Sequence, residues 1–484
     1  MGRRPRPRVR AEAGRPGLCR PDRAGGVITH RRGASPAAPG AVGLASALVP
    51  GLGQLLNREW GKGAVLLAVA GTAAVAELLT GHYADLSGYT PRTHGGFFVR
   101  GLWGLVTLGT QPRAMTVAGL SRGDHSIILM INGIIAVLVL ALIAAITVWA
   151  VRDAARTRRR ILTTGERLTA REWVRSTRQS AFPYLVLAPT LILLLFVTAL
   201  PVVFGILIAF TDYSKDNLPP MQLVEWVGLE NFRQLLGAGA WGATFFGVLG
   251  WTVLWAVLAT ATTYAFGFLQ AVLVSSRRVR LPRLWRSIFF LPWAVPAMIS
   301  ALVFRSMFNG QFGPISQTLV DLGITHERVM WLTDPANPWL ARIVALLVNL
   351  WLGFPYFMAL ISGALTNISP SYYEAARIDG ASAAQQVRYL TLPIVLRATA
   401  PLIVLSFVAN FNNFGVIYFL TQGGPANPDY RYAGSTDILI TWLYKLTLDN
   451  GLYDIASVMS ILIFVIVGSF SVWSLRRSKA FTDA

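Results

Sequence analysis

Residues 374–393 read EAARIDGASAAQQVRYLTLP, a polar stretch that lies between two long apolar runs at 339–363 and 398–421. Each apolar run exceeds the roughly 20 residues that an α-helix needs to cross a bilayer. Within the polar stretch, the spacing predicts two short helices that Gly380 joins and Pro393 closes. The sequence therefore predicts two membrane-spanning helices connected by an exposed helical elbow.

The composition of the whole chain favours the same class of protein. Of its 484 residues, 54% are hydrophobic and only 14% are charged, whereas globular chains carry about 25% charged residues. Lipid offers no hydrogen bonds to a bare backbone, so long apolar runs must form helices. We expect an all-α, polytopic membrane protein.

Eight apolar runs are long enough to span a membrane. They are 63–80, 126–151, 182–210, 242–274, 286–306, 339–363, 398–421 and 452–474. The shorter apolar stretch at 97–120 is interrupted by Arg100 and Arg113. We expect it to lie along the outward-facing surface of the membrane.

The basic residues predict the orientation of these spans. With the N-terminus inside, the cytoplasmic segments hold 32 of the 43 Lys and Arg residues, and the rest of the chain holds 11. This bias follows the positive-inside rule and predicts that both termini are cytoplasmic. It also accounts for the formal net charge of +20 without a nucleic-acid partner.

The apolar runs and the composition between them divide the chain into five expected parts. These are a disordered basic cytoplasmic tail (1–40), a two-span extension (41–151), an Arg-rich cytoplasmic linker (152–181), a six-span domain (182–475) that contains the elbow at 370–393, and a cytoplasmic tail (476–484). The tail lacks the apolar core of a signal peptide. In the extension, Pro50-Gly51-Leu52-Gly53-Gln54 and Asn57 predict a turn at the membrane surface.

The motifs of common catalytic and metal sites are missing from the sequence. There is no phosphate-binding Gly-x4-Gly-Lys-Ser/Thr loop, since Gly61-Lys62-Gly63 lacks the spacing and the hydroxyl, and there is no His-Glu-x-x-His or Gly-x-Ser-x-Gly. The single cysteine, Cys19, and five scattered histidines predict no metal site. We expect no catalytic residue, no bound cofactor and no ATP hydrolysis by this chain alone.

Charged residues are nearly absent from the centres of the spans. Glu77, Arg305, Arg342 and Asp454 all lie near span ends. A charge at the bilayer centre costs at least ~2.5 kcal/mol, so such groups usually mark ion or proton pathways. Their placement disfavours an ion-coupled carrier and favours a neutral substrate.

Two spans instead carry amide and aromatic side chains at membrane depth. One helical face of 339–363 and a short run in 398–421 supply Asn349, Leu352, Gly353 and Tyr356, together with Asn410 and Asn413. An unpaired amide in hydrocarbon costs a few kcal/mol. These groups therefore either bond neighbouring helices, at about 0.6 kcal/mol each, or bind a ligand rich in hydroxyls, because amides both donate and accept.

Several motifs of the chain resemble those of a known family. Glu-Ala-Ala, three residues, Gly, nine residues and Leu-x-Leu-Pro match the EAA coupling loop of ABC-importer permeases. The strings NLWLGFPY at 349–356, NFNNF at 410–414 and TQGGP at 421–425 resemble the MalF-like maltose/maltodextrin permeases.

The resemblance implies a six-helix, MetI-like permease core, preceded here by two further helices, in a bacterial inner membrane. It implies that Asn349, Leu352, Gly353, Tyr356, Asn410 and Asn413 bind sugar, and that Glu374, Ala375, Ala376, Gly380 and Pro393 couple to the ATPase. The implied partners are a MalG-like second permease, a MalK-like ATPase dimer that carries ATP and Mg, an extracytoplasmic sugar-binding protein and membrane lipid.

Two departures from the family bear on the substrate. Ala409 stands where these permeases have a sugar-stacking aromatic residue, and the loop 211–241 lacks their long outer domain. We expect the permease subunit of an ATP-driven importer of maltose or maltodextrins. The alternatives are another α-glucoside or oligosaccharide such as trehalose and, from another class, an ion-coupled sugar carrier.

Overall fold

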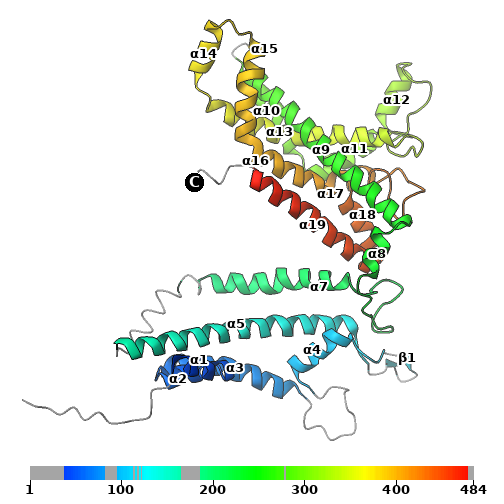
Figure 1. The fold of residues 1–484 in the computed structure, drawn as a ribbon. Helices are drawn as coiled ribbons and strands as arrows, with labels where there is room; N and C mark the ends of the chain where they lie inside the picture. Colours follow the sequence, from blue (N-terminus) through cyan, green and yellow to red (C-terminus); the bar gives the residue numbers. More distant parts are fainter. Residues whose placement is uncertain are drawn as a thin grey trace, which may run out of the picture. The chain divides into compact units, whose positions relative to one another are not determined.

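Helices form most of the described chain in the computed structural model (Figure 1). The structure describes residues 38–81, 95–112, 115–116, 119–120, 123–164, 182, 186–276 and 279–477. The expected tail up to residue 37, the expected linker from 165 to 181 and the C-terminal residues from 478 lie outside this description. The chain divides into two units, residues 1–70 with 145–172 and residues 71–144 with 173–484, and each is described by itself.

The smaller unit is a helical hairpin packed on parts of two longer helices. Its elements are α1 (Pro39–Leu48), α2 (Leu52–Leu56), the start of α3 (Trp60–Thr80) and the end of α5 (Ser126–Thr164). Proline at the first turn begins α1, as its fixed φ favours. Gly51, at φ 101°, then adopts the left-handed turn that joins α1 to α2.

The first part of the larger unit packs against the first half of α5. It contains α4 (Phe97–Thr107), a two-stranded antiparallel pair of β1 (Met115–Thr116) and β2 (Gly119–Leu120), the π-helical η1 (Leu194–Ala199) and α7 (Leu200–Ile208). The stretch 97–120 thus holds one short helix and the strand pair. Buried side chains from α5 and α7, including Met130, Ile134 and Ile208, form one apolar cluster.

The rest of the larger unit is a bundle centred on two long helices, α9 and α13. Its elements are α8 (Glu230–Leu236), α9 (Ala240–Ser275), α10 (Pro282–Ala294), α11 (Ala297–Met307), α12 (Pro314–Asp321), α13 (Pro338–Thr366), α14 (Pro370–Ile378), α15 (Ala383–Gln386), η2 (Val387–Thr391), α16 (Leu392–Phe411), α17 (Phe414–Thr421), α18 (Leu439–Tyr444), η3 (Lys445–Asp449) and α19 (Tyr453–Arg477). Helix α9 packs along α13 and also contacts α16.

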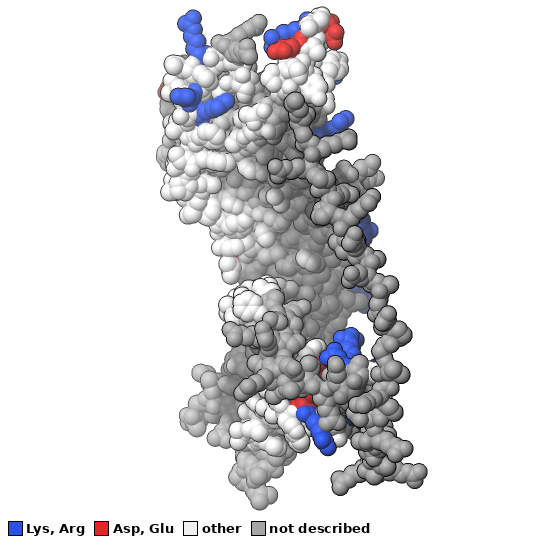
Figure 2. Space-filling model, turned by 90° about the vertical axis from the view of Figure 1, so that its left-hand side faces the viewer, with Lys and Arg blue, Asp and Glu red and all other residues white. Residues whose placement is uncertain are grey.

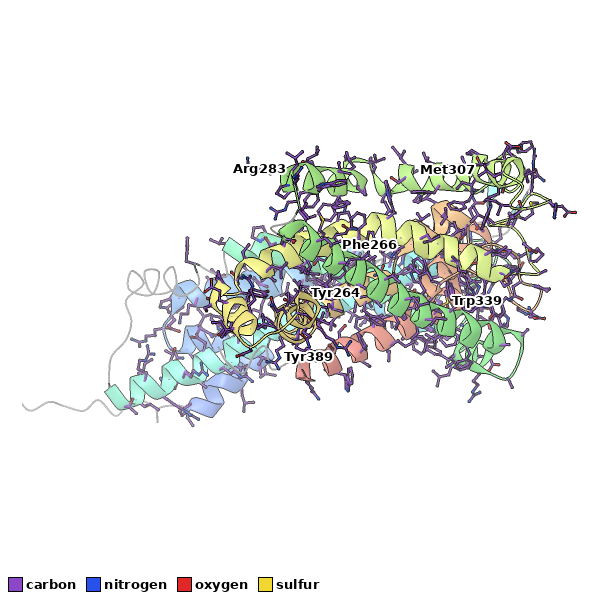
Figure 3. The ribbon with its side chains drawn as sticks, turned by 90° about the horizontal axis from the view of Figure 1, so that it is seen from above. Tyr264, Phe266, Arg283, Met307, Trp339 and Tyr389 are labelled. Atoms are coloured by element: carbon purple, nitrogen blue, oxygen red, sulfur yellow. The ribbon has the colours of Figure 1, made fainter. Side chains whose placement is uncertain are left out.

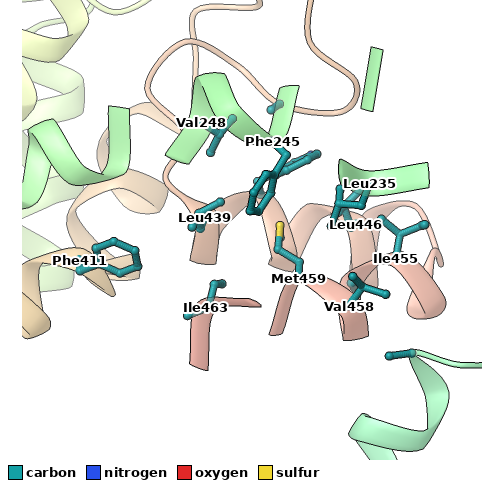
Figure 4. Close-up of a cluster of buried hydrophobic side chains, with 14 of the residues drawn as sticks. Leu235, Phe245, Val248, Phe411, Leu439, Leu446, Ile455, Val458, Met459 and Ile463 are labelled. Carbon is teal, nitrogen blue, oxygen red and sulfur yellow. The ribbon is translucent and has the colours of Figure 1, made fainter. Parts of the chain in front are cut away.

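Three apolar clusters hold this bundle together. Figure 4 shows the largest, in which Phe245 and Val248 of α9 lie against Leu439 of α18 and Met459 of α19. The second cluster joins α9, α13 and α17, and the third joins α9, α13 and α16. Since all three include α9, this helix is the common support for the spans that carry the predicted site.

The expectation of an all-α polytopic membrane protein is confirmed. Among the described residues, seven helices are long and apolar enough to cross a membrane, and one bent pair brings the number to eight. The seven are Trp60–Thr80, Ser126–Thr163, Val186–Ile208, Ala240–Ser275, Pro338–Thr366, Ala383–Thr421 and Tyr453–Ser474. Helix α5 continues beyond the expected end of its span at 151, into the segment expected to be a linker.

The expected span at 286–306 is the bent pair rather than one straight helix. Helices α10 and α11 meet at 87°, and Figure 3 shows Arg283 and Met307 near the outer ends of the pair. Between them, Val295 and Pro296 are both extended. Proline has no N–H for the helix and disfavours a helical residue before it, which explains the bend.

Candidate functional site

The amide and aromatic residues of α13 lie along one side of an unbroken helix. Asn349 is 4% exposed and Tyr356 is 36% exposed, so this side passes from the buried bundle toward an accessible surface. Gly353 lies between them, where an added Cβ would come within 2.8 Å of Thr263 Cγ2 on α9. Glycine is therefore needed for α9 and α13 to approach each other here. Leu352 packs against the cluster shared by α9, α13 and α17.

The second polar run interrupts its helix, which corrects the expectation of a continuous helix through 398–421. Helix α16 ends at Phe411 and α17 begins at Phe414, with Asn412 and Asn413 between them. The Asn413 side chain accepts a hydrogen bond from Val416 N at 3.4 Å and so caps α17. Asparagine side chains compete with helical backbone bonds in this way. Asn410 therefore lies in the last turn of α16, whereas Asn413 lies in the break as the N-cap of α17.

Hydrogen bonds bring the three asparagines together with a threonine of α9. Asn413 Nδ2 donates to Asn349 Oδ1 at 3.0 Å and to Asn410 Oδ1 at 3.5 Å, and Asn410 Nδ2 donates to Thr260 Oγ1 at 3.0 Å. We call Asn349, Asn410, Asn413 and Thr260 the amide cluster. It links α9, α13, α16 and the start of α17 at membrane depth.

The amide cluster keeps some hydrogen-bonding capacity for a ligand. Asn349 Nδ2 has no hydrogen-bond partner among the described residues. Asn412 and Ala409, on either side of Asn410, are exposed. Tyr356 touches the ring of Phe357, at 5.1 Å between centroids, but makes no hydrogen bond to the amides. The structure thus joins the three asparagines directly and leaves Tyr356 separate, on the same side of α13.

Sequence reasoning missed the contribution of α9. Besides Thr260, Trp255 is fully buried and its Nε1 donates to the Asn410 carbonyl oxygen at 3.0 Å, beside the helix break. A carbonyl at a broken helix end needs such a donor in a membrane. The signal for this surface was the run Ala259-Thr260-Ala261-Thr262-Thr263, which concentrates hydroxyls in an otherwise apolar span.

The charged residues near span ends serve local structure. Glu77 accepts hydrogen bonds from Gly96 N at 2.8 Å and Phe98 N at 2.7 Å, at the start of α4. The Arg342 guanidinium donates twice to the Ser435 carbonyl and lies 4.4 Å from the centre of the Trp251 ring. These contacts use the charges to hold helix ends and loops.

A buried ion pair stabilises the loop that follows α17. Lys445 Nζ lies 2.6 Å from Asp437 Oδ2, and the carboxylate also accepts from Thr441 Oγ1 and Gly434 N. Burial raises the pKa of the Asp437 carboxyl, although the nearby Lys445 charge lowers it. Removing either partner would leave a buried charge unpaired, so the pair fixes the geometry of this loop.

The elbow, residues 370–393, is an exposed turn between helices. Helix α14 carries Glu374, Ala375 and Ala376, and the chain reverses at Gly380, whose φ of 79° favours glycine. Ser382 and Gln385 then form a reciprocal capping box at the start of α15. Figure 1 shows α14 and α15 at the end of α16 that points away from α17.

One expectation for the elbow was wrong, because Pro393 does not end its second helix. The π-helical stretch Val387–Thr391 follows α15, and α16 continues through Pro393. A π-turn changes the local backbone pairing, so proline can follow without breaking the helix. The elbow is thus continuous with α16, which ends at Phe411 directly after Asn410.

The surface of the elbow is available to another molecule. Glu374 is exposed and forms no hydrogen bond or ion pair within the described residues, and Ile378 is 87% exposed. Tyr373 Oη and Thr391 Oγ1 lie 3.0 Å apart and join its two arms. On the face that Figure 2 shows, acidic and basic side chains gather near the upper end and again near the lower end. The elbow therefore has a defined shape, held by its own hydrogen bonds, and an exposed surface.

The chain is similar to several known proteins. Residues 263–479 match the model of the family "Binding-protein-dependent transport system inner membrane component". The chain is 36% identical to the galactooligosaccharides transport system permease protein GanP of Bacillus subtilis, over 91% of this chain and 98% of that protein. It is 34% identical to the maltodextrin permease MdxF of the same organism, over 90% of this chain and 94% of that protein.

A third relative and a solved structure complete the comparison. The chain is 36% identical to the maltose/maltodextrin permease MalF of Vibrio vulnificus, over 55% of this chain and 51% of that protein. A bacterial ABC transporter involved in alginate import has a similar fold, with a TM-score of 0.51 at 22% identity, covering 65% of this chain and all of that one. The resemblance found in the sequence is confirmed: this chain belongs to the family of binding-protein-dependent transport system inner membrane components, the membrane-spanning permease subunits of ABC importers.

Proposed function

We propose that this permease carries maltose or maltodextrins across the bacterial inner membrane in an ATP-driven importer. The amide cluster is the observation that supports this cargo most, because its asparagines donate and accept as sugar hydroxyls require. Among the relatives, the permeases named for maltodextrin or maltose share 32 to 36% identity with this chain.

In this proposal, the sugar replaces part of the hydrogen bonding within the amide cluster. Asn349, Asn410 and Asn413 bind hydroxyl groups, and Tyr356 covers an apolar face of a sugar ring, next to Leu352 and Gly353. The unpartnered Nδ2 of Asn349 supports this assignment, because it can donate to a ligand without breaking a protein contact. In this proposal, the small and exposed Ala409 leaves space beside Asn410 for a second sugar ring.

The elbow is the proposed contact with a separate ATPase dimer, which binds ATP and Mg. Glu374, Ala375 and Ala376 form the docking surface of α14, Gly380 allows the reversal, and Pro393 lies where the elbow enters α16. Motion of the elbow would reach Asn410 through one continuous helix, because α15, η2 and α16 have no break between them. Both termini are assigned to the cytoplasm by the charge bias.

Two further partners complete the proposed importer. A second permease subunit is needed to enclose a pathway, and an extracytoplasmic sugar-binding protein would deliver the sugar. The loop stabilised by Asp437 and Lys445 lies at the other end of its spans from the elbow, which suits it to meet this protein. An ion-coupled mechanism is disfavoured, since Glu77 and Arg342 are engaged in structural contacts.

A galactooligosaccharide is the second candidate cargo. The 36% identity to GanP over 91% of this chain favours this cargo. Trehalose serves as a third test sugar, an example of a smaller α-glucoside. Proteoliposomes with the complete importer would be offered labelled maltotriose, a β-linked galactotriose and trehalose in parallel. We expect the fastest ATP-dependent uptake with maltotriose. Preference for galactotriose would overturn the maltodextrin assignment and retain the transport class.

A further inference from the structure

The smaller unit contains a helical hairpin that turns back beside α3. Helix α1 has 10 residues, about half the length of a span, and α2 returns after the turn at Gly51. A Cβ added at Gly51 would lie 2.6 Å from the Gly63 carbonyl oxygen and 3.1 Å from Leu66 Cβ. The turn is therefore pressed against α3 inside the span that begins at Trp60.

The polar side chains of the hairpin point into the protein. Ser46 and Gln54 are fully buried and Asn57 is 3% exposed. Ser46 Oγ donates to Gln54 Oε1 at 2.9 Å. Gln54 Nε2 donates to the Ala150 carbonyl oxygen at 2.8 Å, and Asn57 Nδ2 to that of Ala154 at 2.9 Å. The hairpin is thus fastened to α5 by amides.

The large apolar side chains of the same segment point outward. Those that are exposed are Leu44 (68%), Leu48 (83%), Val49 (41%), Leu52 (37%), Leu56 (55%) and Trp60 (68%). A surface that meets water has the opposite arrangement, with polar groups outside. Polar groups inside and apolar groups outside are typical of protein surrounded by lipid.

Charged side chains of α3 and α5 form a layer next to the hairpin, and the depth of the turn in the membrane can be compared with this layer. Lys62 Nζ lies 3.1 Å from Glu59 Oε1 and 3.4 Å from Asp153 Oδ2, which ties α3 to α5. Burial raises the pKa of the Glu59 carboxyl, while the adjacent Lys62 lowers it. Gly63 and Leu66, which contact the turn, are one and four residues further along α3 than Lys62, or about 1.5 Å and 6 Å at the helical rise. The turn thus lies deeper than the charged layer.

Arginines surround this layer on the outside. Arg152, Arg156 and Arg159 are exposed, and their spacing of i, i+4 and i+7 puts them on one face of α5. Arg58, directly after α2, is also exposed. Anionic lipids attract such basic residues close to a membrane surface. The long arginine side chains can extend from the span toward the headgroups.

We propose that α1 and α2 form a re-entrant hairpin embedded in the arginine-rich leaflet, with its apolar side chains among acyl chains and Arg58, Arg152, Arg156 and Arg159 bound to anionic phospholipid headgroups. Acyl chains cover the outward apolar surface without hydrogen bonds, and the four guanidinium groups complement the phosphates. The extension thereby anchors the permease in this leaflet and selects its anionic lipids. The charge bias assigns this leaflet to the cytoplasmic side.

Spin labels can measure the depth of the hairpin. Cys19 is the only cysteine, so Cys19→Ser provides a background for Leu48→Cys or, as a matched control at the charged layer, Arg58→Cys. The full chain would be placed in nanodiscs of phosphatidylglycerol and phosphatidylcholine, and collisions of the label with oxygen and with a water-soluble nickel chelate would be recorded. We expect strong oxygen and weak nickel collisions at residue 48, and the reverse at residue 58.

Two results would overturn the embedded hairpin. Nickel access at residue 48 equal to that at residue 58 would place the turn in water. An immobilised label that neither reagent reaches would show that a protein covers the surface instead of lipid. Leu44→Cys provides a second exposed position, so the result does not depend on one variant.

Lipid selection tests the arginines separately. We would measure the relative binding of spin-labelled phosphatidylglycerol and phosphatidylcholine to the full chain and to the triple variant Arg152→Gln, Arg156→Gln, Arg159→Gln. The preference for phosphatidylglycerol should fall by about fivefold or more, because each basic residue near the surface contributes. Arg233→Gln, an exposed arginine outside this unit, should leave the preference unchanged. An unaltered preference in the triple variant would refute headgroup binding.

Discussion

The amide cluster and the elbow are the two polar regions of the same spans, and they differ in how far the protein satisfies them. Asn410 and Asn413 bond Thr260 and Asn349 inside the bundle. Glu374 and Ile378 are exposed on α14, and Glu374 forms no hydrogen bond or ion pair among the described residues. A buried polar group supports its own fold, whereas an exposed and pre-shaped surface is available to a partner. Substitutions should therefore affect the two regions in different ways.

Reversing the charge of Glu374 should give the largest loss of sugar uptake. It should also sharpen the contrast between the elbow and the amide cluster. Glu374→Lys removes an exposed carboxylate without disturbing a contact, so insertion should be normal while uptake falls about 30-fold or more, the loss typical of an interface hot spot. Uptake of labelled maltotriose and the amount of membrane-inserted protein measure the two effects. Glu327→Lys, an exposed glutamate in the loop before α13, is the matched control. Normal uptake by Glu374→Lys would remove the elbow from the coupling mechanism.

Replacing Asn410 should reduce transport more than assembly. Asn410→Leu deletes the bonds to Thr260 and Asn413 but keeps the backbone carbonyl that Trp255 binds. Loss of buried hydrogen bonding worth about 1 to 3 kcal/mol predicts roughly tenfold slower uptake. Asn412→Leu makes the same change at the exposed neighbour and should have little effect. Unchanged KM and rate for Asn410→Leu would show that its amide only connects helices.

Gly380 tests whether the elbow depends on its backbone geometry. Gly380→Ala forces a side chain into the left-handed region, at about 1 to 2 kcal/mol, and should lower uptake several-fold by disturbing the angle between α14 and α15. Gly363→Ala is the matched control, since both glycines have open space around them and only Gly380 has a positive φ. Equal uptake by the two variants would mean that the elbow adopts its shape only on the partner.

The bond between Asn349 of α13 and Asn413 in the helix break should give the smallest effect. A double-mutant cycle with Asn349→Ala and Asn413→Ala, measured by thermal unfolding in detergent, should yield a coupling energy of about 0.6 kcal/mol, as is average for side-chain bonds in membranes. The same cycle measured on KM for sugar should give a larger value if both amides also bind substrate. Additive effects in both measurements would show that Asn349 and Asn413 contribute independently to stability and to sugar binding.

The sequence predicted the spans well because hydrophobic length is a direct physical requirement of the bilayer. It also identified Asn349, Asn410 and Asn413, since amides at membrane depth need partners. It did not predict the break at Asn412 and Asn413, because neither proline nor glycine marks it and the side-chain cap forms only in the folded chain. At Pro393 the sequence suggested a helix end that the structure does not have. The π-helical stretch before this proline lets the helix continue.

The hairpin of the smaller unit shows a second limit of the sequence. Helix α1 is too short to register as a span, and Pro50 and Gly51 are equally typical of a surface turn. Its depth depends on the contact of Gly51 with Gly63 and Leu66, which no local pattern contains. The threonines of α9 were overlooked similarly, because their partner Asn410 is 150 residues away.

Uptake by the reconstituted importer tests the central claim most directly. Proteoliposomes containing this permease, its partner permease, the ATPase dimer and the binding protein would be loaded with ATP or energised by a proton gradient alone. The account predicts labelled maltotriose uptake with ATP, none with the gradient, and loss of the ATP-dependent uptake in Glu374→Lys. Sugar uptake driven by the proton gradient without ATP would contradict it.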